Sequence, residues 1–170
     1  MPKLLQIRQL ETGDIDAVLA IQTACYPAHL IESAEALLAK SRLSPSSCWL
    51  VYENDRPLGY LFSHPWQGKI PPALDLPLAC LPDQADCFFL HDLAIHPVAR
   101  GCGAADKLLR HAMQWARAQR FSRTMLVAVQ GSQSFWQRYG FSALAAAAPA
   151  LQEKLAGYEP GAACLTACMT

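Results

Sequence analysis

The fold is decided by the stretch Cys87-Phe-Phe-Leu-His-Asp-Leu-Ala-Ile-His-Pro97 together with Val98-Ala-Arg-Gly-Cys-Gly-Ala-Ala105. Its first part is short, apolar and aromatic, and a proline closes it, which predicts a buried strand ending near His96. After a glycine-rich turn, apolar residues recur at helical spacing, at Ala105, Leu108, Leu109, Ala112 and Ala116. The stretch therefore predicts a strand, a turn and an amphipathic helix in succession.

The turn in this unit has the properties of a phosphate-binding site. Free backbone N–H groups at the start of a helix, with the positive end of the helix dipole behind them, attract an anion beyond the strand. A dinucleotide fingerprint would need a third glycine where Asp106 stands, and the Gly-x4-Gly-Lys-Ser/Thr pattern of a P-loop is absent. The spacing therefore excludes these two phosphate motifs.

The turn instead reads Arg100-x-x-Gly103-x-Ala105. This resembles the Arg/Gln-x-x-Gly-x-Gly/Ala signature of the GCN5-related N-acetyltransferase (GNAT) family, in which it cradles the pyrophosphate of acetyl-coenzyme A. Downstream, residues 125–129 predict another buried strand, and Gln130-Gly-Ser-Gln-Ser-Phe-Trp-Gln-Arg-Tyr-Gly-Phe141 resembles the family's next motif. The two motifs cover residues 87–141, and the chain is most similar to the arylalkylamine-acetyltransferase-like members.

This resemblance implies which residues contact acetyl-coenzyme A, the expected cosubstrate. The pantetheine arm would pair with the backbone of the central strand, which would also offer an N–H to the oxyanion. The implied contacts are Leu93, Ala94, Ile95, Arg100, Gly101, Cys102, Gly103, Ala104, Ala105, Ser134 and Trp136. Although Cys102 lies at a helix N-terminus, where a thiolate is favoured, we interpret it as a phosphate contact, because the family transfers the acetyl group without an acyl-enzyme.

Length and charge indicate one globular domain. A chain of 170 residues is long enough for one buried core and short for two, so we expect a single domain over residues 1–170. Acidic and basic residues both number 14, so net charge argues for neither nucleic acid nor a membrane surface. Asp106 is the only acid between 93 and 140, and no lysine or arginine occurs between 70 and 92. This separation indicates either two solvated faces or a basic cofactor side and an acidic side for a cationic acceptor.

The seven cysteines are an odd number without Cys-x-x-Cys spacing, which indicates neither a disulfide framework nor a zinc site. His91 and His96 lack further ligands at usable spacing, so we expect no metal. The N-terminus has no signal-peptide pattern, and the apolar run 143–151 is broken by Pro149 and too short to span a bilayer. We therefore expect a cytoplasmic protein.

The remaining elements complete an α/β domain. We expect a strand over 4–10, a helix that Thr12 or Asp14 caps and that ends before Tyr26, a helix over 33–41, and hairpin strands at 48–52 and 58–62. Residues 64–86 are rich in proline and predict a loop, either a lid on the substrate side or a surface insertion. An alanine-rich segment over 143–155 and a last strand over 162–168 follow.

The fold class that follows is a single GNAT-like α/β domain. We expect a mixed, mainly antiparallel sheet with helices on both faces. The resemblance implies further that the sheet is splayed open between its fourth and fifth strands, with the cofactor in the gap.

Acetyl transfer to an amine needs a base, because an alkylamine with a pKa near 10.4 is protonated at neutral pH. His91 is the candidate base or proton relay, since the resemblance places it where arylalkylamine acetyltransferases use a histidine. Their second histidine falls at Phe89, and His91 could instead be structural. Strand alternation predicts that Phe89, His91, Leu93 and Ile95 share one face and that Asp92 points away from His91. Asp92 is then expected to fix a neighbouring strand or loop.

Other histidines and acids near the central strand are weaker candidates. His64 and Glu32 could line the acceptor side, and His96 is expected at the end of the strand, in contact with the turn.

The general acid is less defined. The family's usual tyrosine corresponds to Trp136, and an indole N–H cannot serve as an acid. Tyr139, Tyr158 or no acid at all are the options, because a thiolate with a parent pKa near 8.5 is a tolerable leaving group.

The sequence therefore predicts an acetyl-coenzyme A-dependent N-acetyltransferase acting on the primary amine of a small molecule by direct attack in a ternary complex. The alternatives are acetylation of a protein N-terminus or lysine, and a non-catalytic acyl-coenzyme A sensor, which Trp136 would favour. We expect a small-molecule amine as partner, a possible homodimer, and neither nucleic acid nor membrane.

Overall fold

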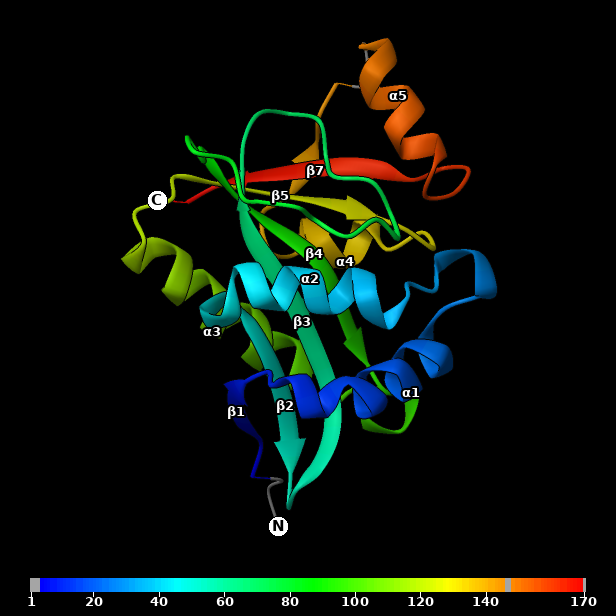
Figure 1. Cartoon of the computed structure of the whole chain (residues 1–170), viewed down its shortest axis with the longest axis vertical. Coiled ribbons are helices and arrows are strands. Elements are labelled where there is room, and N and C mark those ends of the chain that lie inside the picture. Colours follow the sequence, from blue (N-terminus) through cyan, green and yellow to red (C-terminus); the bar gives the residue numbers. More distant parts are fainter. Residues whose placement is uncertain (1–3, 146–147, 170) are drawn as a thin grey trace.

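The computed structural model describes residues 4–145 and 148–169. Within these residues, seven strands form one sheet in the order β1-β2-β3-β4-β5-β7-β6 (Figure 1). Neighbouring strands are antiparallel except β4 and β5, which are parallel. The strands are β1 (Gln6–Gln9), β2 (Cys48–Glu53), β3 (Arg56–Trp66), β4 (Cys87–Ile95), β5 (Arg123–Ala128), β6 (Ser142–Ala143) and β7 (Ala163–Cys168). The mixed, mainly antiparallel sheet is confirmed.

Helices cover both faces of the sheet, as expected. Helices α1 and α2 cross the front of the sheet in Figure 1 and share a buried cluster with Tyr60 and Phe62 of β3. On the other face, α3 packs on Phe88 and Leu90 of β4. The α-helices are α1 (Ile15–Cys25), α2 (Ala34–Leu43), α3 (Ala104–Ala118), α4 (Gln133–Gln137) and α5 (Pro149–Ala156). Short 3-10 turns are η1 (Thr12–Asp14), η2 (Ala28–Leu30), η3 (Pro45–Ser47) and η4 (Pro97–Ala99).

The predicted strand, turn and helix are present as β4, the turn over residues 100–103 and α3. The helix buries the stripe Leu108, Leu109, Ala112 and Ala116, which is the face that the spacing indicated. It begins directly after Gly103, whose φ of +86° lies in the left-handed region that glycine adopts without a Cβ penalty. This conformation aims the first N–H groups of α3 back toward the end of β4.

Strand β4 contains a bulge at His91. Against β3, Asp92 pairs with Phe62 and Leu90 pairs with Ser63, so His91 is the extra residue. A bulge interrupts the alternation of side chains along a strand. Two expectations are therefore wrong. Leu93 and Ile95 pack with the α3-side cluster instead of sharing a face with His91, and Asp92 points to the same side of the sheet as His91, toward α1.

The sheet opens between β4 and β5. Parallel pairing covers only Phe88, Phe89 and Leu90 of β4, opposite Thr124, Met125 and Leu126 of β5. From His91 onward, β4 pairs with β3 alone, while β5 continues alongside β7. The expected splay between the fourth and fifth strands is confirmed.

Strand β3 is longer than its sequence indicated. It continues through Pro65 to Trp66, so His64 lies inside β3, opposite Phe89, and the loop begins only at residue 67. We call residues 67–86 the acceptor loop, after the acceptor side on which the sequence analysis expected a lid; its alternative role as a surface insertion remains open at this point. The alanine-rich segment forms β6 and, from Pro149, α5; its residues 146 and 147 lie outside the described residues.

Candidate active site

A cavity of about 660 Å³ lies where β4 and β5 diverge. One end is the turn before α3, with Arg100 and Gly103 in its wall. The other end lies beside His91, where the pairing of β4 with β5 stops. There Leu30, Glu32, Leu74 and Tyr158 line it. The cavity therefore joins a phosphate-type turn to a group of polar side chains at the narrow end of the splay.

The turn fits a phosphate-bearing ligand. Gly101 has a φ of +78° and Gly103 one of +86°, and a Cβ added to either would meet no atom within 4 Å. The N-terminus of α3 carries no side-chain cap, so its N–H groups and dipole are directed at the cavity. Arg100 and Arg138 add positive charge to the wall. Backbone can approach an anion here without interference from side chains.

The structure gathers nearly all of the expected cofactor contacts in one cavity. Its wall includes Leu93, Ala94 and Ile95 of β4, the turn, the first residues of α3, and Trp136 of α4. Cys102 and Ser134 are not among the lining residues. The thiol of Cys102 donates to the carbonyl oxygen of Ala99 at 2.7 Å, which directs it back into the turn.

His91 is paired with Glu32. The imidazole Nε2 lies 2.6 Å from the Glu32 carboxylate Oε1, across 59 residues of sequence. Two acceptors cannot approach this closely, so Nε2 carries the hydrogen and donates it to the carboxylate. His91 Nδ1 has no hydrogen-bond partner in the described part of the chain. The His91 side chain is 0 % exposed, so its face toward the cavity is main chain.

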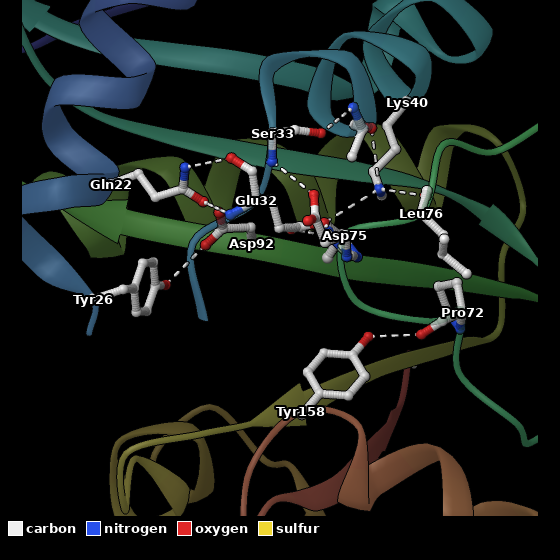
Figure 2. A network of polar contacts seen from close by, with 12 residues as sticks. Gln22, Tyr26, Glu32, Ser33, Lys40, Pro72, Asp75, Leu76, Asp92 and Tyr158 are labelled. Carbon is white, nitrogen blue, oxygen red and sulfur yellow. Dashed lines mark hydrogen bonds and ion pairs between the residues drawn. The ribbon is translucent and has the colours of Figure 1, made fainter. Parts of the chain in front are cut away.

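Glu32 is held from several directions (Figure 2). Its backbone N–H and C=O bond to the side-chain amide of the α1 residue Gln22, at 2.9 and 3.0 Å. Its Oε2 accepts the backbone N–H of Asp75 at 3.0 Å and lies 3.6 Å from the ammonium nitrogen of Lys40. Burial by itself would raise the pKa of Glu32, but the attraction and hydrogen bond of His91, aided by Lys40, outweigh burial and lower it to about 2. Glu32 is therefore a carboxylate at all working pH values.

A second buried carboxylate, Asp92, lies on the same face. Tyr26, after α1, donates its hydroxyl to Asp92 at 2.8 Å, and Tyr60 of β3 does so at 2.7 Å. Burial, with the nearby charge of Glu32, raises the pKa of Asp92 to about 6. The expectation that Asp92 fixes a neighbouring strand is confirmed, since its two bonds tie β4 to β3 and to the end of α1.

Neither candidate acid presents a free hydroxyl. Tyr158 lines the cavity but donates its hydroxyl to the carbonyl oxygen of Pro72 at 2.7 Å. Burial raises the pKa of Tyr158 well above its usual value. Tyr139, on the α4 side of the cavity, approaches Asp106 at 3.5 Å. Trp136 occupies the family's tyrosine position and is almost fully buried in the cavity wall.

The other two candidate histidines, His64 and His96, are not among the residues that line the cavity. His64 is buried in β3, with its ring centroid 6.2 Å from that of His91. His96 follows β4, where its Nδ1 accepts the N–H of Val98 in η4, the short helix before the turn.

The acids of the acceptor loop are largely engaged. Asp86 pairs with Arg123 at 3.0 Å, and Asp75 accepts the N–H of Ser33 at 2.7 Å. Neither Asp75, Asp83 nor Asp86 is among the cavity-lining residues. The acidic residues that do face the acceptor end are Glu32 and Asp92.

Sequence reasoning missed Tyr26 and Lys40. Tyr26 entered the sequence analysis only as the residue before which the first helix ends. Lys40 carried a signal, because it falls at helical spacing on the buried α2 face formed with Ala36, Leu37 and Ser41. A lysine on such a face needs a partner.

Two classes of site are not found among residues 4–145 and 148–169. No cluster of three or more His, Cys, Asp or Glu side chains there could hold a metal ion, and none of the helices there is both long and apolar enough to cross a bilayer.

The architecture therefore places a cavity suited to a phosphate-bearing ligand between two diverging parallel strands. The sequence model of the acetyltransferase (GNAT) family matches residues 15–141, so the chain belongs to the GNAT acetyltransferase family and is an acyltransferase of the N-acetyltransferase type. No curated protein is significantly similar to it in sequence.

Solved structures share the fold over nearly the whole chain. The loading GNATL domain of CurA from Lyngbya majuscula has a TM-score of 0.78 and 13% identity, covering 97% of this chain and 98% of that one. The GphF GNAT-like decarboxylase in complex with isobutyryl-CoA has a TM-score of 0.78 and 17% identity, covering 97% and 100%. The ribosomal-protein-S18-alanine N-acetyltransferase from Escherichia coli has a TM-score of 0.68 and 13% identity, covering 98% and 95%. Because the sequence identities are this low, the likeness to these structures shows the fold alone.

Proposed function

We propose that this protein transfers the acetyl group of acetyl-coenzyme A to the primary amine of a small molecule by direct attack in a ternary complex. The observation that carries this proposal is that one cavity contains both the phosphate-type turn and the Glu32–His91 pair. Because both lie on the wall of one cavity beside β4, the thioester and the amine can meet without an intermediate carrier. When bound, acetyl-coenzyme A supplies the activated acetyl group.

The turn and the splayed strand would hold the cosubstrate. Residues 100–105 present N–H groups and an unfilled space to the pyrophosphate. Beyond His91, β4 lacks a β5 partner, so the backbone of this segment could bond to the pantetheine arm and offer an N–H to the developing oxyanion. The carbonyl oxygens of Leu93 and Ile95 accept bonds from Tyr26 and Cys25, which the pantetheine arm would have to share or displace. The absence of side chains over the two glycines supports this placement.

The Glu32–His91 pair would remove the proton from the acceptor ammonium. With Nε2–H donated to Glu32, the neutral ring carries its lone pair on Nδ1, which is the nitrogen free to accept a proton. The carboxylate of Glu32 fixes this tautomer and stabilises the imidazolium that forms, as the aspartate of a catalytic triad does. Because the His91 side chain is covered, acceptor binding must open a path to it.

We route no proton to the leaving thiolate through a side chain. The hydroxyl hydrogens of Tyr158 and Tyr139 are directed at Pro72 and Asp106. A thiolate with a parent pKa near 8.5 can leave without an acid.

A small acceptor is favoured by the closed end of the cavity. The acceptor loop is tied to the segment before β7 by the Tyr158–Pro72 bond and to the α1–α2 connection by the Asp75–Glu32 bond. Leu74 of this loop and Leu30 leave an apolar space beside the Glu32 carboxylate. An extended peptide would have to displace the loop.

The test is release of free thiol from acetyl-coenzyme A against a panel of amines and peptides. We expect turnover with a small primary amine and its loss by about 100-fold in His91→Ala, the usual contribution of a general base. His111→Ala, which removes an exposed histidine on α3, should leave turnover unchanged. Turnover with peptides alone would contradict a small acceptor. Cofactor binding without turnover would favour a sensor.

A further inference from the structure

We propose that Lys40 is a positioning residue for acetyl transfer: its ammonium group pairs with one oxygen of the Glu32 carboxylate and so sets the pH at which His91, bonded to the other oxygen, accepts a proton. The inference rests on the proposed function, in which His91 is the base. Lys40 is not among the cavity-lining residues, so it acts through Glu32.

Packing does not account for the charge at position 40. The Lys40 side chain is 0 % exposed and lies between α2 and the acceptor loop. A buried ammonium carries a desolvation cost that an apolar side chain of similar length would avoid. The cost is met by the ion pair with Glu32, whose own side chain is 2 % exposed. The two charges are therefore interdependent.

The contacts of Lys40 divide the two oxygens of the Glu32 carboxylate (Figure 2). Oε2 lies 3.6 Å from the Lys40 nitrogen and accepts the N–H of Asp75. The other oxygen, Oε1, lies 2.6 Å from His91 Nε2. The ammonium is itself anchored, since it donates to the carbonyl oxygens of Ala36 at 3.1 Å and Leu76 at 3.5 Å. The charge of Lys40 therefore acts on Oε2, while the bond of Oε1 to His91 and that of Oε2 to Asp75 do not depend on it.

The same contacts join the acceptor loop to the base. Asp75 and Leu76 belong to that loop, and their backbone groups bond to Glu32 and Lys40 respectively. Seating of the loop therefore completes the environment in which Glu32 acts on His91.

Lys40 should also make His91 less basic. The positive charge of Lys40, paired with the oxygen of Glu32 that does not bond to His91, opposes the formation of imidazolium. It does so because it offsets part of the attraction of the carboxylate. At the effective dielectric constant of about 20 that holds in proteins, removing such a charge should raise the midpoint of His91 by roughly one pH unit. A purely structural lysine would not move that midpoint.

Several other titratable groups face this pair. They are His64 on β3, Asp92 on β4, Tyr26 after α1, Tyr60 on β3, and Tyr158 before β7. Burial lowers the pKa of His64 to about 3 and raises those of the three tyrosines, so these groups stay neutral at working pH. Asp92, with a pKa of about 6, titrates close to a histidine. The experiment must therefore observe the His91 ring itself.

The direct test is ¹⁵N NMR of the histidine rings in the ligand-free protein, with His91→Ala to assign the signal. We expect the Nε2–H tautomer in the wild type. In Lys40→Met, and in Lys40→Gln, which retains a donor for the Ala36 carbonyl, the His91 midpoint should rise by roughly one pH unit. Arg42→Met removes an exposed charge from the same helix and should leave the midpoint unchanged.

Activity adds an independent reading. In the Lys40 variants, the midpoint of the acidic limb of the pH profile of kcat should rise together with the NMR midpoint, in the wild-type and Asp92→Asn backgrounds alike. The KM for acetyl-coenzyme A should stay constant. An unchanged His91 midpoint in both Lys40 variants, or an equal shift in Arg42→Met, would overturn the inference.

Two outcomes need a separate reading. If the wild type transfers no acetyl group, the proposed function fails, and the NMR titration still decides the role of Lys40. If both single Lys40 variants fail to fold, Glu32→Gln is compared with Lys40→Met/Glu32→Gln, which leaves no unpaired buried ammonium. A higher His91 midpoint in the double variant supports the inference, and equal midpoints overturn it.

Discussion

Tyr158 donates its hydroxyl hydrogen to the carbonyl oxygen of Pro72 at 2.7 Å, across 86 residues of sequence. The bond links the segment before β7 to the acceptor loop, directly above the cavity that both line. It assigns Tyr158 a visible role in closing the acceptor end, which differs from the role of a general acid.

Replacing Tyr158 with phenylalanine separates these two roles. We expect Tyr158→Phe to lose about 1 kcal/mol of stability, as for one buried hydrogen bond, and to raise the KM for the amine several-fold because the loop is released. Its kcat should change less than threefold. Steady-state kinetics and subtilisin cleavage of residues 67–86 measure both effects. A fall in kcat of about 100-fold with unchanged KM would instead identify Tyr158 as the acid.

The ion pairs of Glu32 predict a pH-dependent contribution to folding. Its pKa is lowered from 4.5 to about 2 in the folded protein, so the stabilisation is fully present above pH 4.5 and is lost as pH falls toward 2. The shift corresponds to about 3 kcal/mol. We expect Glu32→Gln to be destabilised at pH 7, where it leaves the Lys40 ammonium unpaired, and the difference from wild type to shrink below pH 4.5.

Urea unfolding of wild type and Glu32→Gln at pH 7 and pH 3 measures this difference. Glu35→Gln, an acidic residue in the first turn of α2, serves as the matched control. A difference that stays constant with pH would contradict the assignment of an ionised, buried Glu32.

The ionisation of Asp92 should have the opposite effect on stability from that of Glu32. Its pKa is raised from 3.8 to about 6, so the folded protein holds the proton more tightly and loses stability as pH rises between these values. Asp92→Asn removes this ionisation. We expect the variant to gain about 2 kcal/mol relative to wild type between pH 4 and pH 7, measured by urea unfolding at both pH values. A difference in the free energy of unfolding between Asp92→Asn and wild type that does not change with pH would show that Asp92 ionises normally.

The glycines of the turn predict loss of cofactor binding without loss of folding. Gly103→Leu places a side chain at a φ of +86° on the cavity wall. The left-handed conformation costs about 1–2 kcal/mol, whereas the Cβ occupies the space of the phosphates. We expect acetyl-coenzyme A binding to become undetectable by calorimetry.

Gly161→Leu serves as the control, because it introduces the same backbone strain away from the cavity. Gly161 has a φ of +82°, equally open surroundings and an exposed position in the turn before β7. This variant should show a similar thermal shift and retain cofactor binding. Tight binding by Gly103→Leu would refute the phosphate assignment of the turn.

The elements near the turn could be predicted because their signals are local. The spacing of Leu108, Leu109 and Ala112 defines the buried face of α3, and Gly103 marks where the helix begins. The bulge at His91 could not be predicted, because both faces of β4 are buried and the alternation of polar and apolar residues carries no information there.

The candidate base could be predicted only in part. His91 is in the site, but its partner Glu32 comes from the α1–α2 connection, which tertiary packing alone brings against β4. The expected separation into a basic side and an acidic side is also incomplete in the structure, because Arg123 of β5 pairs with Asp86 of the acceptor loop. The arylalkylamine-like placement remains a prediction.

The three residue pairs that join β4 to β5 have a mechanical consequence. The two half-sheets, β1–β4 and β5–β7, share one short seam, and beyond it β4 and β5 have no strand partner on their facing edges, as at the edge of a sheet. A ligand that bonds to this backbone takes the place of a strand. Binding of the cosubstrate should therefore increase the cooperativity of unfolding between the two half-sheets. Hydrogen exchange of the backbone at residues 92–95 should become slower when the cosubstrate is bound.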